Sequence, residues 1–329
     1  MTSRPKIYIT GGAGYVGSML SLYLAKKGYN VTILDLFIYE KNIFDSQKNI
    51  NSILGDIRDT EKLKETLPGN DILIHLACIS NDPSFELNPK LGKSINLDSF
   101  EPLVQLSKKF KIKKFIYASS SSVYGISDEK NVHEEVDLKP LTDYSKYKAE
   151  CEKILLKYSS DDFCTTIIRP ATVCGYSVRQ RLDVVVNILT NLAYHNREIT
   201  VFGGDQLRPN IHIDDMIRSY DLLINTDKNL INKKIFNVGY DNFPVIEIAK
   251  KVKKIIGDDV KLQLVPTDDN RSYHISSKKI KDELGFMPEK KIDDAIIDLK
   301  TAFAKGLLPN SLKDKKYFNI KTMQKINLK

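Results

Sequence analysis

A segment of ten residues, TDYSKYKAEC at 142–151, holds two tyrosines and two lysines in an order that could carry proton chemistry. Tyr144 and Lys148 are four residues apart, so on a helix they lie on one face. A tyrosine with its usual pKa of about 10 is a poor base at neutral pH, but a neighbouring ammonium ion favours the phenolate. The phenolate can take a proton from a hydroxyl group as a hydride leaves. Tyr147 has only Cys151 at the same spacing, and a plain solvent-facing pair is the alternative for Tyr144 and Lys148 taken alone.

A glycine-rich segment, YITGGAGYVGS, follows a strand-like stretch near the N-terminus and opens a helical one. Its first glycine permits a tight turn, its second lets the backbone approach a diphosphate, and its third lets the helix pack closely on the sheet. The helix N-terminus then offers N–H groups to the phosphates. In this context the segment predicts a dinucleotide site rather than a plain glycine-rich turn. The predicted cofactor contacts here are Gly11, Gly14, Tyr15, Val16 and Gly17.

Two aspartates follow the next strand candidates. Asp35 ends VTILD and can accept both hydroxyl groups of an adenosine ribose, whereas it would repel a 2′-phosphate. Because no arginine or lysine follows until Lys41, the sequence favours NAD over NADP. Asp56 in GDIRD could hold the adenine amino group, with a turn or helix-cap role as the alternative. Further cofactor contacts are predicted at Ile57, Leu76, Ala77, Lys148 and Pro170.

The elements that must position these residues alternate along the first half of the chain. Apolar runs rich in Ile, Val, Tyr and Thr predict strands at 6–10, 30–35, 51–57, 71–77, 113–120 and 164–170. Helical patterns lie between them at 15–27, 60–66, 94–110 and 144–158. This alternation predicts an α/β fold with a Rossmann-like, doubly wound parallel sheet, which binds ligands at the carboxyl ends of its strands.

After residue 175 the regular alternation of strands and helices ends. We expect helices at 182–195, 211–225, 245–257, 276–284 and 292–305, strands at 198–203, 234–240 and 260–266, and a polar tail at 313–329. No linker of low complexity separates this part from the first. The sequence therefore predicts an NAD-binding Rossmann domain of 1–175, to which 205–240 return, and a smaller interwoven substrate lobe of 176–204 and 241–329.

Composition excludes several classes of protein. The net charge is +8, but the lysines are spread over many segments without interleaved aromatic residues, so we expect no nucleic-acid partner. No apolar run is long enough for a membrane span, and the start of the chain does not resemble a signal peptide. The four cysteines have neither metal-ligand nor disulfide spacing, so we expect no metal site and a cytoplasmic location.

Together these segments resemble the extended short-chain dehydrogenase/reductase family, in particular its NAD-dependent nucleotide-sugar epimerase/dehydratase branch. The segments TGGAGYVG, GDIRD, HLA, SSSSVYG, YSKYK, RPATVCG, RPNIHIDD and LGFMP occur in the expected order over nearly the whole chain. The resemblance implies an enzyme with NAD as cofactor and a nucleoside-diphosphate sugar as substrate. It implies Tyr144 and Lys148 as catalytic residues with Ser120, counted back from VYG, and leaves Ser121 and Ser122 as alternatives to that serine.

The resemblance also implies a set of substrate contacts. Asn187 and Arg208 match positions that touch the diphosphate or the sugar, and Thr172 stands where many relatives carry asparagine. Arg179 and Arg181 lie in a loop that could bind phosphate, and a surface role is the alternative for every arginine named here. Asn96 matches an asparagine that supports the active site. The full predicted substrate set is Ser80, Asn81, Ser121, Ser122, Thr172, Arg179, Asn187, Arg208 and Arg271.

Departures from the family pattern narrow the reaction. Relatives that eliminate water carry Asp and Glu at the positions of Ser121 and Ser122, and relatives that epimerise C3 and C5 place a cysteine near Ser122. Cys174 could approach the site, although a small core residue is its simpler role. What remains is oxidation at one carbon, most simply C4.

We therefore expect a nucleotide-sugar 4-epimerase. The alternatives are a 4-dehydrogenase or ketoreductase and, less favoured, a 4,6-dehydratase. A non-catalytic NAD-binding protein is the other class, and the intact Ser–Tyr–Lys set argues against it. In many relatives the helices matching 94–110 and 144–158 pair between subunits, which implies a homodimer.

Overall fold

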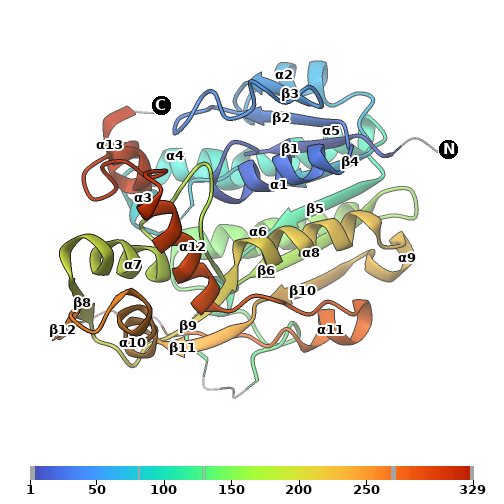
Figure 1. Ribbon diagram of the computed structural model, residues 1–329. Coiled ribbons are helices and arrows are strands. Elements are labelled where there is room, and N and C mark those ends of the chain that lie inside the picture. Colours follow the sequence, from blue (N-terminus) through green and yellow to red (C-terminus); the bar gives the residue numbers. More distant parts are fainter. Residues whose placement is uncertain (1–3, 81, 128, 130, 268–271, 327–329) are drawn as a thin grey trace.

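A seven-stranded parallel sheet runs through the middle of the protein in the computed structural model, which describes residues 4–80, 82–127, 129, 131–267 and 272–326 (Figure 1). Each neighbouring pair of strands is parallel. The expected Rossmann-like α/β fold is confirmed. In spatial order the strands are β10 (Lys234–Val238), β6 (Cys164–Pro170), β5 (Lys114–Ala118), β4 (Ile72–His75), β1 (Ile7–Thr10), β2 (Val31–Asp35) and β3 (Ile50–Leu54).

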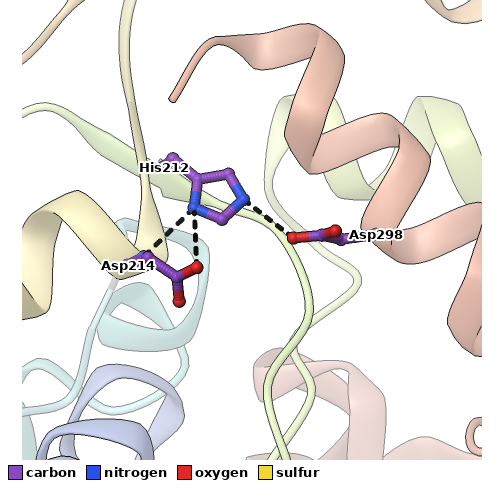
Figure 2. Close-up of side chains that lie close together, drawn as sticks. All are labelled: His212, Asp214 and Asp298. Atoms are coloured by element: carbon purple, nitrogen blue, oxygen red, sulfur yellow. Dashed lines mark hydrogen bonds and ion pairs between the residues drawn. The ribbon is translucent and has the colours of Figure 1, made fainter. Parts of the chain in front are cut away.

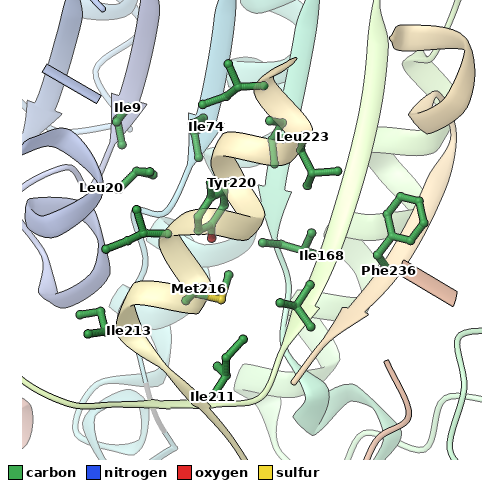
Figure 3. Packing of buried hydrophobic residues seen from close by; sticks show 14 of the residues in the cluster. Ile9, Leu20, Ile74, Ile168, Ile211, Ile213, Met216, Tyr220, Leu223 and Phe236 are labelled. Carbon is green, nitrogen blue, oxygen red and sulfur yellow. The ribbon is translucent and has the colours of Figure 1, made fainter. Parts of the chain in front are cut away.

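Helices cover both faces of this sheet, so its strands carry the continuous apolar runs seen in the sequence. Successive side chains point to opposite faces. Ile9 of β1 therefore joins the core on one face, whereas Tyr8 joins the core on the other. The first face packs against α1 (Tyr15–Lys26) and α8 (Ile213–Asn225), and Figure 3 shows Met216, Tyr220 and Leu223 of α8 among the isoleucines of the strands. The second face packs against α2 (Thr60–Thr66), α5 (Phe100–Lys109) and α6 (Asp143–Tyr158).

The strand order reverses between β1 and β4, which creates a crevice at the carboxyl ends of these two strands. The chain leaves β4 through α3 (Asp82–Glu86), α4 (Pro89–Lys93) and a π-helical turn, η1 (Ser94–Asp98), before α5 begins. The sequence predicted one helix over 94–110. The structure places a wider helical turn at its start, and Asn96 on this turn bonds both the N–H and the carbonyl group of Ile79.

The smaller lobe has its own core, formed by α7 (Val185–Asn196), α10 (Val245–Ile256) and α12 (Ile292–Ala304) against two short strands. Those strands are β8 (Glu198–Phe202) and β12 (Lys261–Val265), which pair in parallel. A three-stranded sheet joins the lobes and consists of β7 (Thr172–Cys174), β9 (Leu207–His212) and β11 (Asp241–Pro244). Two short helices, α9 (Lys228–Ile231) and α11 (Lys278–Leu284), flank β10.

Two segments differ from expectation. The helix predicted at 211–225 begins only at Ile213, because the chain before it forms β9, whose backbone pairs with a strand on each side. The tail, predicted to be polar with a few anchoring residues, forms the 3₁₀ turn η3 (Lys315–Tyr317) and the helix α13 (Asn319–Ile326). Tyr317 and Phe318 are buried there, and α13 contacts α3. Within the part of the chain that the structure describes, no helix has the length and apolar character to cross a membrane.

Candidate active site

A cavity of about 520 Å³ opens at the carboxyl ends of the central strands, where the glycine-rich turn, the start of α6 and the small sheet meet. All of the residues predicted to contact the cofactor line it, as do the three predicted catalytic residues. Of the predicted substrate contacts, the cavity is lined by Ser80, Ser121, Ser122, Thr172, Arg179 and Arg208. The fold therefore brings together segments that are up to about 200 residues apart in the chain.

The glycine-rich turn has the shape of a diphosphate site. Gly11 has a φ of +74°, and a Cβ atom there would come within 2.6 Å of the backbone nitrogen of Ala77. Gly17 packs against the turn so closely that a Cβ atom would collide with the carbonyl oxygen of Gly11. Gly14 precedes α1 without a side-chain cap. The N–H groups of the first helical turn therefore remain available to an anion, as NAD requires.

Asp35, the residue predicted to bind the adenosine ribose, ends β2 and lines the cavity. Its carboxylate accepts hydrogen bonds from the N–H groups of Ala13 (2.9 Å) and Phe37 (2.8 Å), which fix its direction. Burial raises its pKa, and these hydrogen bonds and the charge of Arg179 oppose that effect. In the sequence no arginine or lysine follows Asp35 until Lys41. The fold brings Arg179 to it from a distant loop.

Asp56 also lines the cavity, but its carboxylate is engaged by the neighbouring Arg58. The Nη2 atom of Arg58 lies 2.7 Å from Oδ2, and its Nε atom lies 3.0 Å from Oδ1. Burial alone would raise the pKa of Asp56, but these contacts hold it below its usual value. Asp56 is thus an ionised acceptor at the adenine end of the cavity, as the predicted contact with an amino group needs.

Tyr144 and Lys148 lie in the first two turns of α6, on the side that faces the cavity. A capping box between Thr142 and Ser145 fixes the start of this helix. Lys148 is buried, and its Nζ atom donates a hydrogen bond of 2.7 Å to the carbonyl oxygen of Ala118 at the end of β5. The same Nζ atom lies 5.9 Å from the ring centroid of Tyr144. The strand thus holds the ammonium group beside the tyrosine.

The predicted catalytic serine lies directly after β5. Ser120 is extended and caps the short 3₁₀ helix η2 (Ser121–Tyr124), where its Oγ atom accepts a hydrogen bond from the N–H group of Ser122 (3.1 Å). The two hydroxyl oxygens, Ser120 Oγ and Ser122 Oγ, are 2.9 Å apart. Ser121 is buried. Both Ser120 and its alternative Ser122 therefore line the cavity as one hydrogen-bonded pair.

A network of buried charges lies behind these residues. Arg169 on β6 makes two hydrogen bonds to the carboxylate of Glu152 on α6, at 3.0 and 2.7 Å, and a third to the hydroxyl group of Tyr124 at 2.8 Å. The Oγ atom of Ser119 donates to the same glutamate. Glu152 follows Lys148 by four residues on α6, so the network ties the helix that carries Tyr144 to the strand end that carries Ser120. We call this network the buried wall.

Four other residues of the sequence analysis have different outcomes. Asn187 does not line the cavity. It is fully buried, and its amide group bonds the N–H group of Gly175 (3.0 Å), the hydroxyl group of Tyr15 (3.1 Å) and the carbonyl group of Arg181 (2.8 Å). It supports this loop, and its contact with the substrate stays a prediction. Asn81 and Arg271 lie outside the described residues, so their roles stay predictions. Cys174 is a buried core residue, as its simpler interpretation held.

Several cavity residues escaped the sequence analysis because only the fold brings them there. Asp183 pairs with Arg181 at 2.5 Å and raises the pKa of that arginine, whereas burial would lower it. The other additions are Tyr39 after β2, Tyr273 near Arg208, and Asn319 and Met323 from α13. None of them belongs to a recognisable motif. The aromatic residues of the tail were the one available signal that it packs on the protein.

A second cluster of polar groups lies outside the cavity, and Figure 2 shows its three members, His212, Asp214 and Asp298. The N–H group of Asp214 donates to Nδ1 of His212 (3.1 Å), so the ring proton is on Nε2, which bonds Asp298 (3.1 Å). His212 and Lys290 hold the pKa of Asp298 below its usual value. Both ring nitrogens are engaged, so the histidine acts as a cap for α8 and links it to α12.

Comparison with known proteins identifies the family. Residues 7–239 match the NAD dependent epimerase/dehydratase family. The chain is 32% identical to a dTDP-D-glucose 4,6-dehydratase of Dictyostelium discoideum over 76% of this chain, and it spans 62% of the length of that relative. It is 27% identical to a UDP-glucose 4-epimerase of Lactobacillus helveticus, over 88% of this chain and 94% of the other.

A solved structure agrees with these matches. The UDP-glucuronic acid 4-epimerase of Bacillus cereus, in complex with UDP-glucuronic acid and NAD, superposes with a TM-score of 0.82 at 26% identity, over 91% of this chain and 99% of that one. The chain therefore belongs to the NAD dependent epimerase/dehydratase family. It is an enzyme whose cofactor is NAD, and the glycine-rich turn, Asp35 and Asp56 fit that cofactor.

Proposed function

We propose that the protein is a nucleotide-sugar 4-epimerase. The observation that carries the proposal is the arrangement of Tyr144, Lys148 and Ser120 along one wall of the dinucleotide cavity, with serines at 121 and 122. Such a set can remove a proton and a hydride from one carbon of a sugar and then restore them. It offers no carboxylates at the positions that elimination of water would need.

In this mechanism Tyr144 takes the proton of the sugar 4-hydroxyl group and later returns it. The ammonium group of Lys148, held by Ala118, favours the phenolate form that accepts this proton. The Ser120 hydroxyl group, oriented by Ser122, hydrogen-bonds the same sugar oxygen. NAD, held by the glycine-rich turn and Asp35, would supply the acceptor and donor of the C4 hydride. Inversion then requires only that the keto-sugar turn in the site between the two steps.

The acidic groups of the cavity support this reaction over elimination. Among the described residues that line the cavity, the carboxylates are Asp35, Asp56 and Asp183. Asp35 ends β2 and Asp56 follows β3, on the side proposed for adenosine, and Asp183 is paired with Arg181. None of them stands next to Ser120 in the chain, where dehydratases carry their acid and base. A 4,6-dehydratase is therefore the less favoured alternative, although relatives of this chain include proteins with that name.

The C-terminal segment supports an epimerase over a 4-dehydrogenase or ketoreductase. Asn319 and Met323 of α13 line the cavity, and Asn319 bonds Ser80, Arg179 and Asp183. A cofactor behind such a segment can stay in place through both half-reactions. A dehydrogenase would instead exchange the cofactor after every turnover.

For the substrate we propose a nucleoside-diphosphate sugar that lies between the sheet edge and the smaller lobe. Arg208 on β9 lines this part of the cavity, with its guanidinium 5.4 Å from the ring of Tyr273, and Thr172 begins β7 beside it. We keep the division into an NAD-binding domain of 1–175 and 205–240 and a substrate lobe of 176–204 and 241–329. Thr172 and Arg208 then reach the substrate from the edge of the NAD-binding domain.

We further propose a homodimer in the cytoplasm. The support for the dimer is the resemblance of α5 and α6, which pack side by side, to the helices that pair in many relatives. The four cysteines form no disulfide, which agrees with a reducing compartment. Sedimentation at several concentrations tests the dimer.

The test of the reaction is to incubate the purified protein with UDP-, GDP-, CDP- and dTDP-sugars, and to follow NADH absorbance and product stereochemistry together. We expect a 4-epimer of one nucleotide sugar with no accumulation of NADH. Stoichiometric NADH with a keto-sugar would establish a dehydrogenase, and a 4-keto-6-deoxy product would establish a dehydratase.

A further inference from the structure

Arg179 is a buried cation without an ion-pair partner among the described residues. Only 3% of its surface is exposed, its Cζ atom lies 3.5 Å from the ring centroid of Tyr39, and its Nη2 atom donates to Asn319 Oδ1 at 2.6 Å. Its Nε atom is buried and has no hydrogen-bond partner, and no carboxylate of the described residues forms an ion pair with it. A buried charge of this kind is costly unless an anion compensates it.

The position of Arg179 in the cavity indicates which anion it meets. Its guanidinium stacks on Tyr39, which lies shortly after Asp35 in the chain. Ser177 in the same loop donates a hydrogen bond of 2.9 Å to the backbone oxygen of Tyr15 at the start of α1. The charge of Arg179 also opposes the effect of burial on the pKa of Asp35. Arg179 therefore faces the stretch between the glycine-rich turn and the ribose-binding aspartate. In a Rossmann fold the diphosphate of the dinucleotide crosses this stretch.

We propose that Arg179 binds the diphosphate of NAD, and that Asn319 at the start of α13 holds the guanidinium in position. The inference rests on the NAD site of the proposed function and differs from the expectation that Arg179 contacts the substrate. The two arginines lie on different sides of the cavity. Arg208, on the small sheet beside Tyr273, remains for the diphosphate of the sugar nucleotide, whereas Arg179 lies on the cofactor side.

Asn319 connects three parts of the cavity rim. Its side-chain oxygen accepts from Arg179, its side-chain nitrogen donates to Ser80 Oγ at 2.8 Å, and its backbone nitrogen donates to Asp183 Oδ2 at 2.8 Å. It is itself 3% exposed. The cofactor diphosphate and the C-terminal helix thus share one guanidinium, which makes departure of NAD dependent on this contact.

The experiment measures binding to cofactor-stripped protein by calorimetry, without any sugar nucleotide. Three probes separate the contributions, namely NAD, ADP and adenosine, of which only adenosine lacks the diphosphate. For Arg179→Met we expect about 10- to 100-fold weaker binding of NAD and ADP, the range for a lost charge-assisted hydrogen bond, with adenosine unchanged. Arg179→Lys, which keeps the charge but loses the planar fork, should fall in between.

The matched control is Arg4→Met. Arg4 also stacks on a tyrosine, with its Cζ atom 5.0 Å from the ring centroid of Tyr29, but it is exposed and does not line the cavity. It should bind all three probes like wild type. Thermal unfolding of each variant shows whether it is folded, and Arg179→Lys provides the readout if Arg179→Met is not.

Two results would overturn the assignment. Unchanged NAD affinity in Arg179→Met with weakened binding of UDP would give this arginine to the substrate. An equal loss for adenosine and ADP would show that the variant disturbs the ribose site and not a phosphate contact. In either case a wild-type protein that still epimerises its sugar would leave the proposed function intact. Failure of the wild-type protein to bind NAD at all would contradict both the role of Arg179 and the proposed function.

Discussion

Two arginines of this protein are equally buried, at 3% exposure, and yet they are in opposite electrostatic situations. Every nitrogen of the Arg169 guanidinium bonds a protein oxygen, two of them on Glu152. Arg179 has Asn319 and the face of Tyr39. Burial would lower the pKa of both, but Glu152 and Tyr124 more than reverse this effect at Arg169, whereas the pKa of Arg179 falls to about 10.

The difference separates two tasks within one site. A charge that the protein satisfies internally fixes geometry, and the buried wall around Arg169 holds α6 and the end of β5 in one arrangement. The charge of Arg179, which has no ion-pair partner among the described residues, is the one that we propose binds a ligand. Residues of the wall should therefore change turnover and stability, and residues near Arg179 should change binding.

The largest expected effect is on the catalytic pair that the wall supports. Tyr144→Phe keeps the ring and removes only the proton, so kcat should fall by about 10²–10⁴-fold, the usual contribution of a general acid–base group. NAD affinity should not change. Tyr147→Phe is the matched control, because its ring packs on Phe85 with the centroids 5.6 Å apart. A loss of activity in Tyr147→Phe but not in Tyr144→Phe would show that Tyr147, and not Tyr144, transfers the proton.

The next effect concerns stability. Glu152→Leu leaves Arg169 as a buried charge without its carboxylate, and the free energy of unfolding in urea should fall by about 3–5 kcal/mol. The double variant Glu152→Leu with Arg169→Met should recover most of this loss, because no unpaired charge remains. Arg179→Met should cost far less, since it removes a charge that had no carboxylate partner. Equal losses of unfolding free energy in Arg179→Met and Glu152→Leu would contradict the distinction between the two arginines.

Cofactor choice should show a smaller change. Asp35→Ala removes the acceptor for the ribose hydroxyl groups and should weaken NAD by about 10-fold or more, as expected for lost hydrogen bonds to a charged group. NADP should gain, because Arg179 stays nearby and no carboxylate opposes the 2′-phosphate. Titration of both cofactors into stripped protein measures the change. Wild-type protein that binds NAD and NADP equally would refute the role given to Asp35.

The smallest expected effect is that of the C-terminal helix. Asn319→Ala leaves Arg179 in place but removes its acceptor, so NAD should dissociate only several-fold faster, in line with one neutral hydrogen bond of about 1 kcal/mol. Stopped-flow displacement by excess ADP gives the rate. Lys325→Ala, an exposed change in the same helix, should match wild type. An unchanged rate in Asn319→Ala would separate the helix from cofactor retention.

The fold and the catalytic pair could be predicted from the sequence because their causes are local. Strands buried on both faces are continuous apolar runs, and Tyr144 and Lys148 are four residues apart on one helix. The glycine spacing likewise predicts the backbone conformation of the turn, and Gly11 has a positive φ.

The rest depended on contacts between distant segments. Arg179 meets Tyr39 and Asn319 across about 140 residues in each direction, so no spacing in the sequence predicts its side of the cavity. Asn187 matched a substrate position by motif, but its amide group is used up by the loop that it supports. The strand β9 was missed because its apolar residues run directly into those of α8.

The central claim is that one carbon of a nucleotide sugar loses and regains its hydride within a single binding event. The most direct measurement uses a substrate deuterated at C4, together with unlabelled NAD, and reads the product by NMR and mass spectrometry. We predict an inverted configuration at C4 with the deuterium retained and no label in the solvent or in free cofactor. Product that has inverted but lost its deuterium, or deuterated NADH released into solution, would contradict the account.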